Sequence, residues 1–92
     1  MMKAQLDERP GELTIRVCGR LAEGWVEELE HLWREARDAH PGAAVSVDLR
    51  GVTFIDHAGI ELLRRMHSGG AHFLAAGLRN QEVVNQVTGG SK

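Results

Sequence analysis

The sequence predicts an α/β domain with a mixed four-stranded sheet and elements in the order strand, strand, helix, strand, helix, strand, helix (ββαβαβα). Near the N-terminus, two segments of alternating polarity flank a Pro-Gly pair, which predicts an antiparallel β-hairpin. After the hairpin, amphipathic helical segments alternate with short apolar runs, which predicts parallel strands joined by crossover helices. The 92 residues, 42% apolar and 26% charged, fit one small domain spanning residues 1–92.

The hairpin is predicted from Lys3–Glu8 and Leu13–Cys18, which both alternate apolar with polar residues. Between them, Arg9–Glu12 places Pro and Gly at the two central positions of a type II turn. Cys18 is the only cysteine, which excludes an internal disulfide and a thiolate metal cluster. Within the run "LTIRVCG" we expect its thiol to be buried and inert.

The segment "WVEELEHLWREARDAH" predicts the first helix, over residues 25–40. Its charged side is expected to be a solvated face, and His40-Pro41-Gly42 is expected to end it. Trp25 stands at the start of the apolar stripe, so it either joins the core or anchors a partner. The stripe consists of Trp25, Val26, Leu29, Leu32, Trp33 and Ala36.

The second half of the chain predicts two further strands, each followed by a helix. In the first of these helices, Ile60, Leu63 and Met66 are expected to face inward. The cations in its last turn suit the negative end of the helix dipole; they are Arg64, Arg65 and His67. The segments are a central strand at 43–51, a helix after the turn at 56–59, a strand at 71–77, a helix at 80–87 and a frayed end at 88–92.

The turn between the central strand and the following helix has its own sequence signals. Asp56 is predicted to cap the helix by accepting a hydrogen bond from the N–H of Ala58 or Gly59. Ile55 and Ile60 stand at the two positions of a hydrophobic staple. Phe54 and Ile55 are expected to anchor the turn, and Gly59 to let the helix pack closely.

The stretch "VSVDLRGVTFIDHAGIELLRRMHSGGAHFLAAG" resembles the STAS family, the sulfate transporter and anti-sigma-factor antagonist domains. The resemblance covers about residues 3–88 and implies a SpoIIAA-like fold. Many members continue with a further strand and helix, so the chain resembles a minimal version with an open flank. The residues that carry it are Asp48, Leu49, Val52, Phe54, Ile55, Asp56 and Gly59.

The resemblance also identifies a departure from the family pattern. In bacterial antagonists of this family, the residue after the turn aspartate is a serine or threonine that an anti-sigma-factor kinase phosphorylates. Here the equivalent position is His57, followed by Ala58, and neither carries a hydroxyl. Thr53 and Ser68 are the nearest hydroxyls but do not occupy that position. The resemblance therefore implies a domain without the usual phosphoswitch.

His57 has several possible roles. Phosphohistidine chemistry would need a histidine-directed kinase, a metal site would need further ligands at suitable spacing, and a general base would need a nucleophile. The kinases of the STAS family transfer phosphate to hydroxyls, and the sequence offers neither further metal ligands at suitable spacing nor a recognisable nucleophile beside His57. Two interpretations stay open: a tolerant exposed position, or a contact residue on a binding surface.

The predicted function is that of a non-enzymatic protein-interaction module without a cofactor. It is expected to dock a partner through the turn and the helix after it. The alternatives are an anti-sigma-factor antagonist with an altered switch, which would regulate a sigma factor, and a small STAS subunit of a membrane lipid transport complex of the ABC type. The candidate contact residues are Asp56, His57, Ala58, Gly59, Glu61 and Arg64.

Composition limits the partners and the location. The net charge of −2 offers no basic face for a phosphate backbone, so the expected partner is a protein, with a homodimer as a further possibility. The "SGG" and "TGG" segments lack the Lys and Ser/Thr of a phosphate loop. No apolar run approaches the roughly 20 residues that span a bilayer, and the N-terminus lacks the apolar core of a signal peptide. We therefore expect a cytoplasmic protein.

Overall fold

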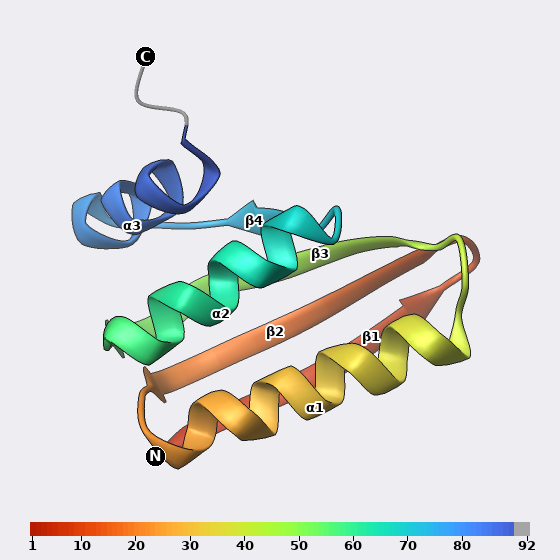
Figure 1. Cartoon of the computed structure of the whole chain (residues 1–92), viewed down its shortest axis with the longest axis horizontal. Helices are drawn as coiled ribbons and strands as arrows, with labels where there is room; N and C mark the ends of the chain where they lie inside the picture. The colour runs from red at the N-terminus through yellow and green to blue at the C-terminus, as the bar shows by residue number, and fades with distance from the viewer. Residues whose placement is uncertain (90–92) are drawn as a thin grey trace.

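A computed structural model of the chain describes residues 1–89, and the outermost part of the predicted frayed end, residues 90–92, lies outside the described residues. The predicted order ββαβαβα is confirmed (Figure 1). The elements are β1 (Met2–Arg9), β2 (Glu12–Leu21), α1 (Gly24–Ala39), β3 (Ala44–Ile55), α2 (His57–Ser68), β4 (His72–Leu74) and α3 (Leu78–Thr88).

The four strands form one mixed sheet in the order β1-β2-β3-β4. The strands β1 and β2 are antiparallel, while β2–β3 and β3–β4 are parallel, as predicted. Arg9 pairs with Glu12 across the hairpin turn, and Gly11 has φ 74°, the left-handed value that the third residue of a type II turn requires. The Pro-Gly pair therefore fixes the hairpin register.

The strand β3 is longer than predicted, because it continues to Ile55 through two irregularities in its pairing with β2. At the first, the register passes from Arg16↔Asp48 to Cys18↔Gly51, so β3 carries one extra residue. Asp48 is buried there, and its carboxylate accepts hydrogen bonds from the Arg50 backbone N–H at 3.0 Å and from the Arg50 guanidinium at 2.9 and 3.0 Å. This pairing with Arg50 lowers the pKa of Asp48.

The core lies between the sheet and the helices α1 and α2, which cross the same face of the sheet (Figure 1). Leu63 and Met66 of α2 are buried as predicted, and Leu62 joins them. In α1 the prediction holds for four of the six stripe residues: Val26, Leu29, Trp33 and Ala36 are buried. Leu32 is half-buried and Trp25 is 40% exposed, because both lie at the margin of the stripe.

The other face of the sheet explains two wrong predictions. Val17 is buried, so its neighbour Cys18 points away from the helices and is exposed rather than part of the core. Phe54 is also exposed and does not anchor the turn in the core; its ring instead stacks under the Arg20 guanidinium, 4.5 Å from the ring centroid. Strand alternation therefore places both side chains on a face that α1 and α2 do not cover.

The C-terminal elements differ in extent from the prediction. The strand β4 is short, because only His72–Leu74 pairs with β3, and the helix α3 begins two residues earlier than expected. Asn80 of α3 is buried and donates to the carbonyl oxygens of Leu49 at 3.2 Å and Val52 at 3.0 Å. This side chain fastens α3 to the irregular part of β3.

Candidate functional site

Asp56 directly follows β3 and caps α2, as the sequence predicts. Its backbone is extended (φ −89°, ψ −177°), and its Oδ1 accepts a hydrogen bond from the Gly59 N–H at 2.8 Å. The N–H of Asp56 itself donates to the Leu21 carbonyl at 3.2 Å. The end of β2 and the first turn of α2 are therefore joined through one residue.

The same carboxylate has a second function that the sequence did not reveal. Asp56 Oδ2 accepts a hydrogen bond from the backbone N–H of Glu23 at 3.0 Å. Glu23 is the N-cap residue of α1, has a left-handed φ of 56°, and supplies no side-chain cap of its own. The hydrogen bond from Gly59, followed by that from Glu23, lowers the pKa of Asp56, so the carboxylate stays ionised. One carboxylate thus holds the starts of both helices.

Gly59 provides the close approach that the sequence predicted. A Cβ at this position would lie 2.7 Å from the Leu21 carbonyl oxygen and 2.8 Å from Ile55 Cγ2. The residue is buried, so it serves the packing of α2 and presents no side chain to a partner. Ile55 and Ile60 are half-buried against the core, and their mutual staple contact stays a prediction.

The remaining candidate residues lie on the surface of α2. His57 has 88% of its side chain exposed, and its Nε2 lies 3.9 Å from Glu61 Oε2. Glu61 also pairs with Arg64, at 3.5 Å from its Nε, and Ala58 is exposed. The structure therefore divides the six candidates into Asp56 and Gly59, which build the turn, and four residues that face outward.

A groove of about 400 Å³ runs beside these residues, between α1 and α2. Its carboxylates come from both helices and from the loop before α1, so the groove is mainly acidic. It is lined by Glu23, Val26, Glu27, Glu30, Ala58, Glu61 and Arg65.

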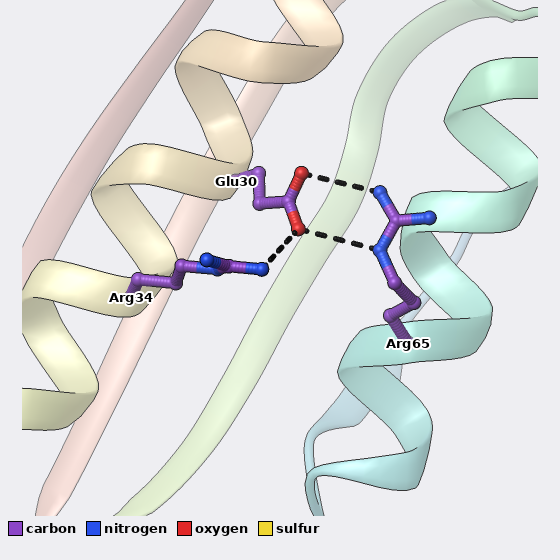
Figure 2. Close-up of polar contacts among 3 residues, drawn as sticks. All are labelled: Glu30, Arg34 and Arg65. Atoms are coloured by element: carbon purple, nitrogen blue, oxygen red, sulfur yellow. Dashed lines mark hydrogen bonds and ion pairs between the residues drawn. The ribbon is translucent and has the colours of Figure 1, made fainter.

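An ion pair crosses between the two helices along this groove (Figure 2). Arg65 of α2 donates through Nη2 to Glu30 Oε1 at 3.2 Å and through Nε to Oε2 at 3.3 Å, and Arg34 donates to Oε2 at 3.1 Å. The hydrogen bond from Arg65 is the main cause of the lowered pKa of Glu30. From the sequence, Glu30 was expected to lie on a solvated face and Arg65 to stabilise the negative end of the α2 dipole. No sequence pattern indicated that the two side chains would pair.

The described residues form neither a metal site nor a membrane-spanning helix. Within residues 1–89, no group of three or more His, Cys, Asp and Glu side chains could hold a metal ion. In the same part of the chain, every helix is too short or too polar to cross a bilayer.

Comparisons with known proteins identify the fold. No family model matches the chain, and no curated protein sequence matches it. An anti-sigma factor antagonist from Mycobacterium paratuberculosis has a similar structure, with a TM-score of 0.79 and 20% identity over 97% of this chain and 79% of that one.

Two further solved structures are similar. The anti-sigma factor antagonist SpoIIAA in its unphosphorylated form gives a TM-score of 0.68 and 22% identity over 88% of this chain and 80% of that one. An uncharacterised protein of Shewanella loihica with a SpoIIAA-like fold gives a TM-score of 0.60 and 14% identity, over 94% of this chain and 75% of that one. With its mixed sheet, its ββαβαβα order and these similarities, the chain has the SpoIIAA-like fold, that of the STAS domains.

Proposed function

We propose that the protein is a non-enzymatic interaction module of the STAS type, which docks a protein partner through the turn at 56–59 and the exposed side of α2. The observation that supports this most strongly is the contrast within the turn. Its backbone is fixed by Asp56 and Gly59, while the side chains of His57 and Ala58 project into solvent at the start of α2. A surface fixed before binding loses little conformational entropy when a partner arrives.

The charge of the neighbouring groove indicates the chemistry of the partner. Glu23, Glu27 and Glu61 face the groove, and Arg65 is engaged by Glu30. A partner that presents basic side chains beside the turn would find complementary charge, which favours both specificity and the rate of association. We place this interaction in the cytoplasm.

The proposal includes the absence of Ser/Thr phosphorylation at the usual position. A phosphate at position 57 would add a dianion next to the Asp56 carboxylate and would change the charge of the docking surface. His57 and Ala58 cannot accept phosphate through a hydroxyl. The docking surface would therefore lack the charge switch that phosphorylation at this position provides.

An anti-sigma-factor antagonist with an altered switch is the second candidate function. Its support is that two of the similar solved structures are anti-sigma factor antagonists. In this case the partner would be an anti-sigma factor, and the chain would regulate a sigma factor.

Affinity capture from the native cytoplasm tests the docking surface. Ala58→Arg and Glu61→Arg change exposed or half-exposed side chains without touching the two hydrogen bonds of Asp56. Glu82→Arg on α3 is the matched control for Glu61→Arg, because it makes the same charge change on an exposed position of another helix. We expect both α2 variants to lose the partner that wild type and Glu82→Arg retain; identical capture by all four proteins would refute docking at this surface.

The identity of the captured protein separates the functions. An anti-sigma factor would support the second candidate, and an ATPase of a transport complex would support a transporter subunit. Incubation with a cognate anti-sigma-factor kinase and ATP, followed by intact-mass measurement, tests the switch. We expect no mass gain for wild type and one phosphate for His57→Ser, whereas phosphate on wild type would contradict a fixed surface.

A further inference from the structure

We infer that the free edge of β1 is a dimerisation surface, at which two copies of this chain pair their β1 strands antiparallel about a two-fold axis through Gln5. The two sheets would then join into one sheet of eight strands. This surface differs from the proposed docking turn, because β2 lies between β1 and β3 in the sheet. Either proposal can therefore fail without the other.

The strand β1 has the properties of a pairing edge. It is an outer strand of eight residues, Met2–Arg9, and its register with β2 is constant from Met2↔Gly19 to Arg9↔Glu12. It contains no proline and no bulge, two of the features that block association at an edge. Charged side chains are a third such feature, and β1 carries both signs of charge, so their effect depends on the register of the two strands. The opposite edge, β4, has only three residues. Of the two edges in the described part of the chain, β1 is therefore the long and regular one.

The hairpin fixes which backbone groups of β1 are free. Arg20 N–H donates to the Met1 carbonyl at 2.9 Å, and Arg9 pairs with Glu12 across the two-residue turn, so odd-numbered residues of β1 bond to β2. Hydrogen bonding in an antiparallel pair alternates from residue to residue. The N–H and C=O groups of Met2, Ala4, Leu6 and Glu8 therefore point away from β2, toward the free edge.

Side-chain charge selects one register for two such edges. With the axis at Gln5, Ala4 of one copy faces Leu6 of the other in a hydrogen-bonded pair, and Lys3 faces Asp7. The Lys3–Asp7 pair is non-hydrogen-bonded, the kind in which facing side chains are closest. An axis at Ala4 would set Lys3 against Gln5, and an axis at Leu6 would set it against Arg9. Of these three registers, only the one with its axis at Gln5 pairs oppositely charged side chains, twice by symmetry.

The existing partner of Asp7 is compatible with this arrangement. Asp7 Oδ2 lies 3.1 Å from Arg16 Nη2, and both side chains are about half exposed. The carboxylate has a second oxygen free for Lys3 of the other copy. Asp7 would then lie between two cations on the face of the sheet that α1 and α2 leave open.

The helix side of β1 supplies apolar surface for the second copy to cover. A groove of about 300 Å³ lies between α1 and β1, lined by Met2, Ala4, Leu32 and the 40% exposed Trp25. A second β1 strand would extend the sheet along the open side of this groove. Glu28 and Glu35 line it as well, with His31 paired to Glu35 at 3.0 Å, so like charges approach across the axis and limit the affinity.

Sedimentation velocity over a range of protein concentrations tests the inference. We expect wild type to pass from monomer to dimer, and Lys3→Asp or Asp7→Lys each to weaken the dimer at least about tenfold, because each places two like-charged pairs at the axis. The double variant Lys3→Asp/Asp7→Lys rebuilds both pairs in reverse and should restore the dimer. A wild type that stays monomeric, or a double variant no better than the single ones, would overturn the inference.

A backbone variant tests the edge itself. Ala4→Pro removes an N–H that points to the free edge and leaves the hydrogen bonds between β1 and β2 in place. We expect it to be monomeric, with wild-type far-ultraviolet circular dichroism; a folded Ala4→Pro protein that still dimerises would show that β1 is not the interface. Should this variant fail to fold, the charge-reversal series, which changes only exposed side chains, decides the question.

Discussion

The backbone N–H of Glu23 donates to the Asp56 carboxylate at 3.0 Å, across 33 positions of sequence, while the other oxygen of that carboxylate caps α2. The loop before α1 and the turn before α2 therefore share one acceptor. A change at Asp56 reaches both helices, so its effect on binding cannot be interpreted without its effect on stability.

Asp56 should give a graded series of stability changes. Asp56→Asn keeps one side-chain oxygen for the Gly59 N–H and loses the bond from Glu23, whereas Asp56→Ala loses both. We expect the free energy of unfolding to fall by about 1 kcal/mol for Asn and about 2 kcal/mol for Ala, from typical cap and hydrogen-bond values. Urea denaturation measures both; a wild-type value for Asp56→Asn would show that the Glu23 bond contributes nothing, and equal losses in the two variants would show the same for the Gly59 bond.

Stability should decrease in acid through three carboxylates. The folded-state pKa values of Asp56, Asp48 and Glu30 are lowered by their hydrogen bonds to Gly59, Arg50 and Arg65. Each carboxylate therefore binds a proton more readily in the unfolded chain than in the folded one. Its contribution to the free energy of unfolding is fully present above the unfolded-state pKa of about 4 and is lost as the pH falls through the lower folded-state pKa. Urea midpoints measured from neutral pH downward should fall, and the fall should be shallower in Asp56→Asn.

Alanine substitutions at Gly59 and Gly24 together test whether α2 needs a glycine where it approaches β2 closely. Gly59→Ala places a methyl group 2.7 Å from the Leu21 carbonyl oxygen, so we expect a loss of about 1–3 kcal/mol despite the better helix propensity of alanine. Gly24→Ala at the start of α1 meets nothing within 4 Å and should be neutral or stabilising by up to about 1 kcal/mol. Thermal unfolding compares them, and equal effects would contradict steric control at position 59.

The pair between the helices should show measurable coupling. A double-mutant cycle of Glu30→Gln and Arg65→Gln is expected to give a coupling free energy of about 0.5–1 kcal/mol. The Glu30 side chain is only 20% exposed, and Arg65 contacts both of its carboxylate oxygens (Figure 2). The cycle of Glu30→Gln with Arg34→Gln should give a smaller coupling free energy, because the Arg34 side chain is 62% exposed. Both couplings should shrink in high salt, and a salt-independent value would rule out an electrostatic origin.

Asn80 should be more important for stability than any other polar residue of α3. Asn80→Leu keeps the approximate volume but leaves the buried carbonyls of Leu49 and Val52 without their donor, which costs about 1–3 kcal/mol. Asn85→Leu in the same helix changes an exposed position and should alter the free energy of unfolding by less than about 0.5 kcal/mol. Denaturant unfolding of both variants tests this difference.

The order of elements and the central part of the turn could be predicted because their signals are local. Helical and strand periodicity, the Pro-Gly turn and the capping position of Asp56 all depend on residues within a few positions of one another. Leu63 and Met66, two of the core positions of α2, followed from the same periodicity, whereas Leu62 did not.

The features that the sequence did not reveal depend on contacts between distant segments. The bond from Glu23 to Asp56, the Arg65–Glu30 pair and the anchoring of α3 by Asn80 each join segments about 30 residues apart, and no local pattern marks them. The position of Cys18 was predicted wrongly although a local signal was present. In the alternation of β2, Cys18 follows Thr14 and Arg16 on the face opposite the buried Leu13, Ile15 and Val17, but the prediction rested on the apolar character of its side chain.

The exposed Cys18 gives the protein a single natural site for a thiol-reactive label. Because Cys18 is the only cysteine, a nitroxide spin label can be placed on the open sheet face without mutagenesis. Cys18 pairs with Lys3, one strand in from the β1 edge. With the axis at Gln5, two such positions would be separated by three strand spacings and four residues along the strand, which is roughly 20 Å between backbones. Pulsed electron paramagnetic resonance between the two labels could then measure the distance between the copies, and with it the register of the β1 strands.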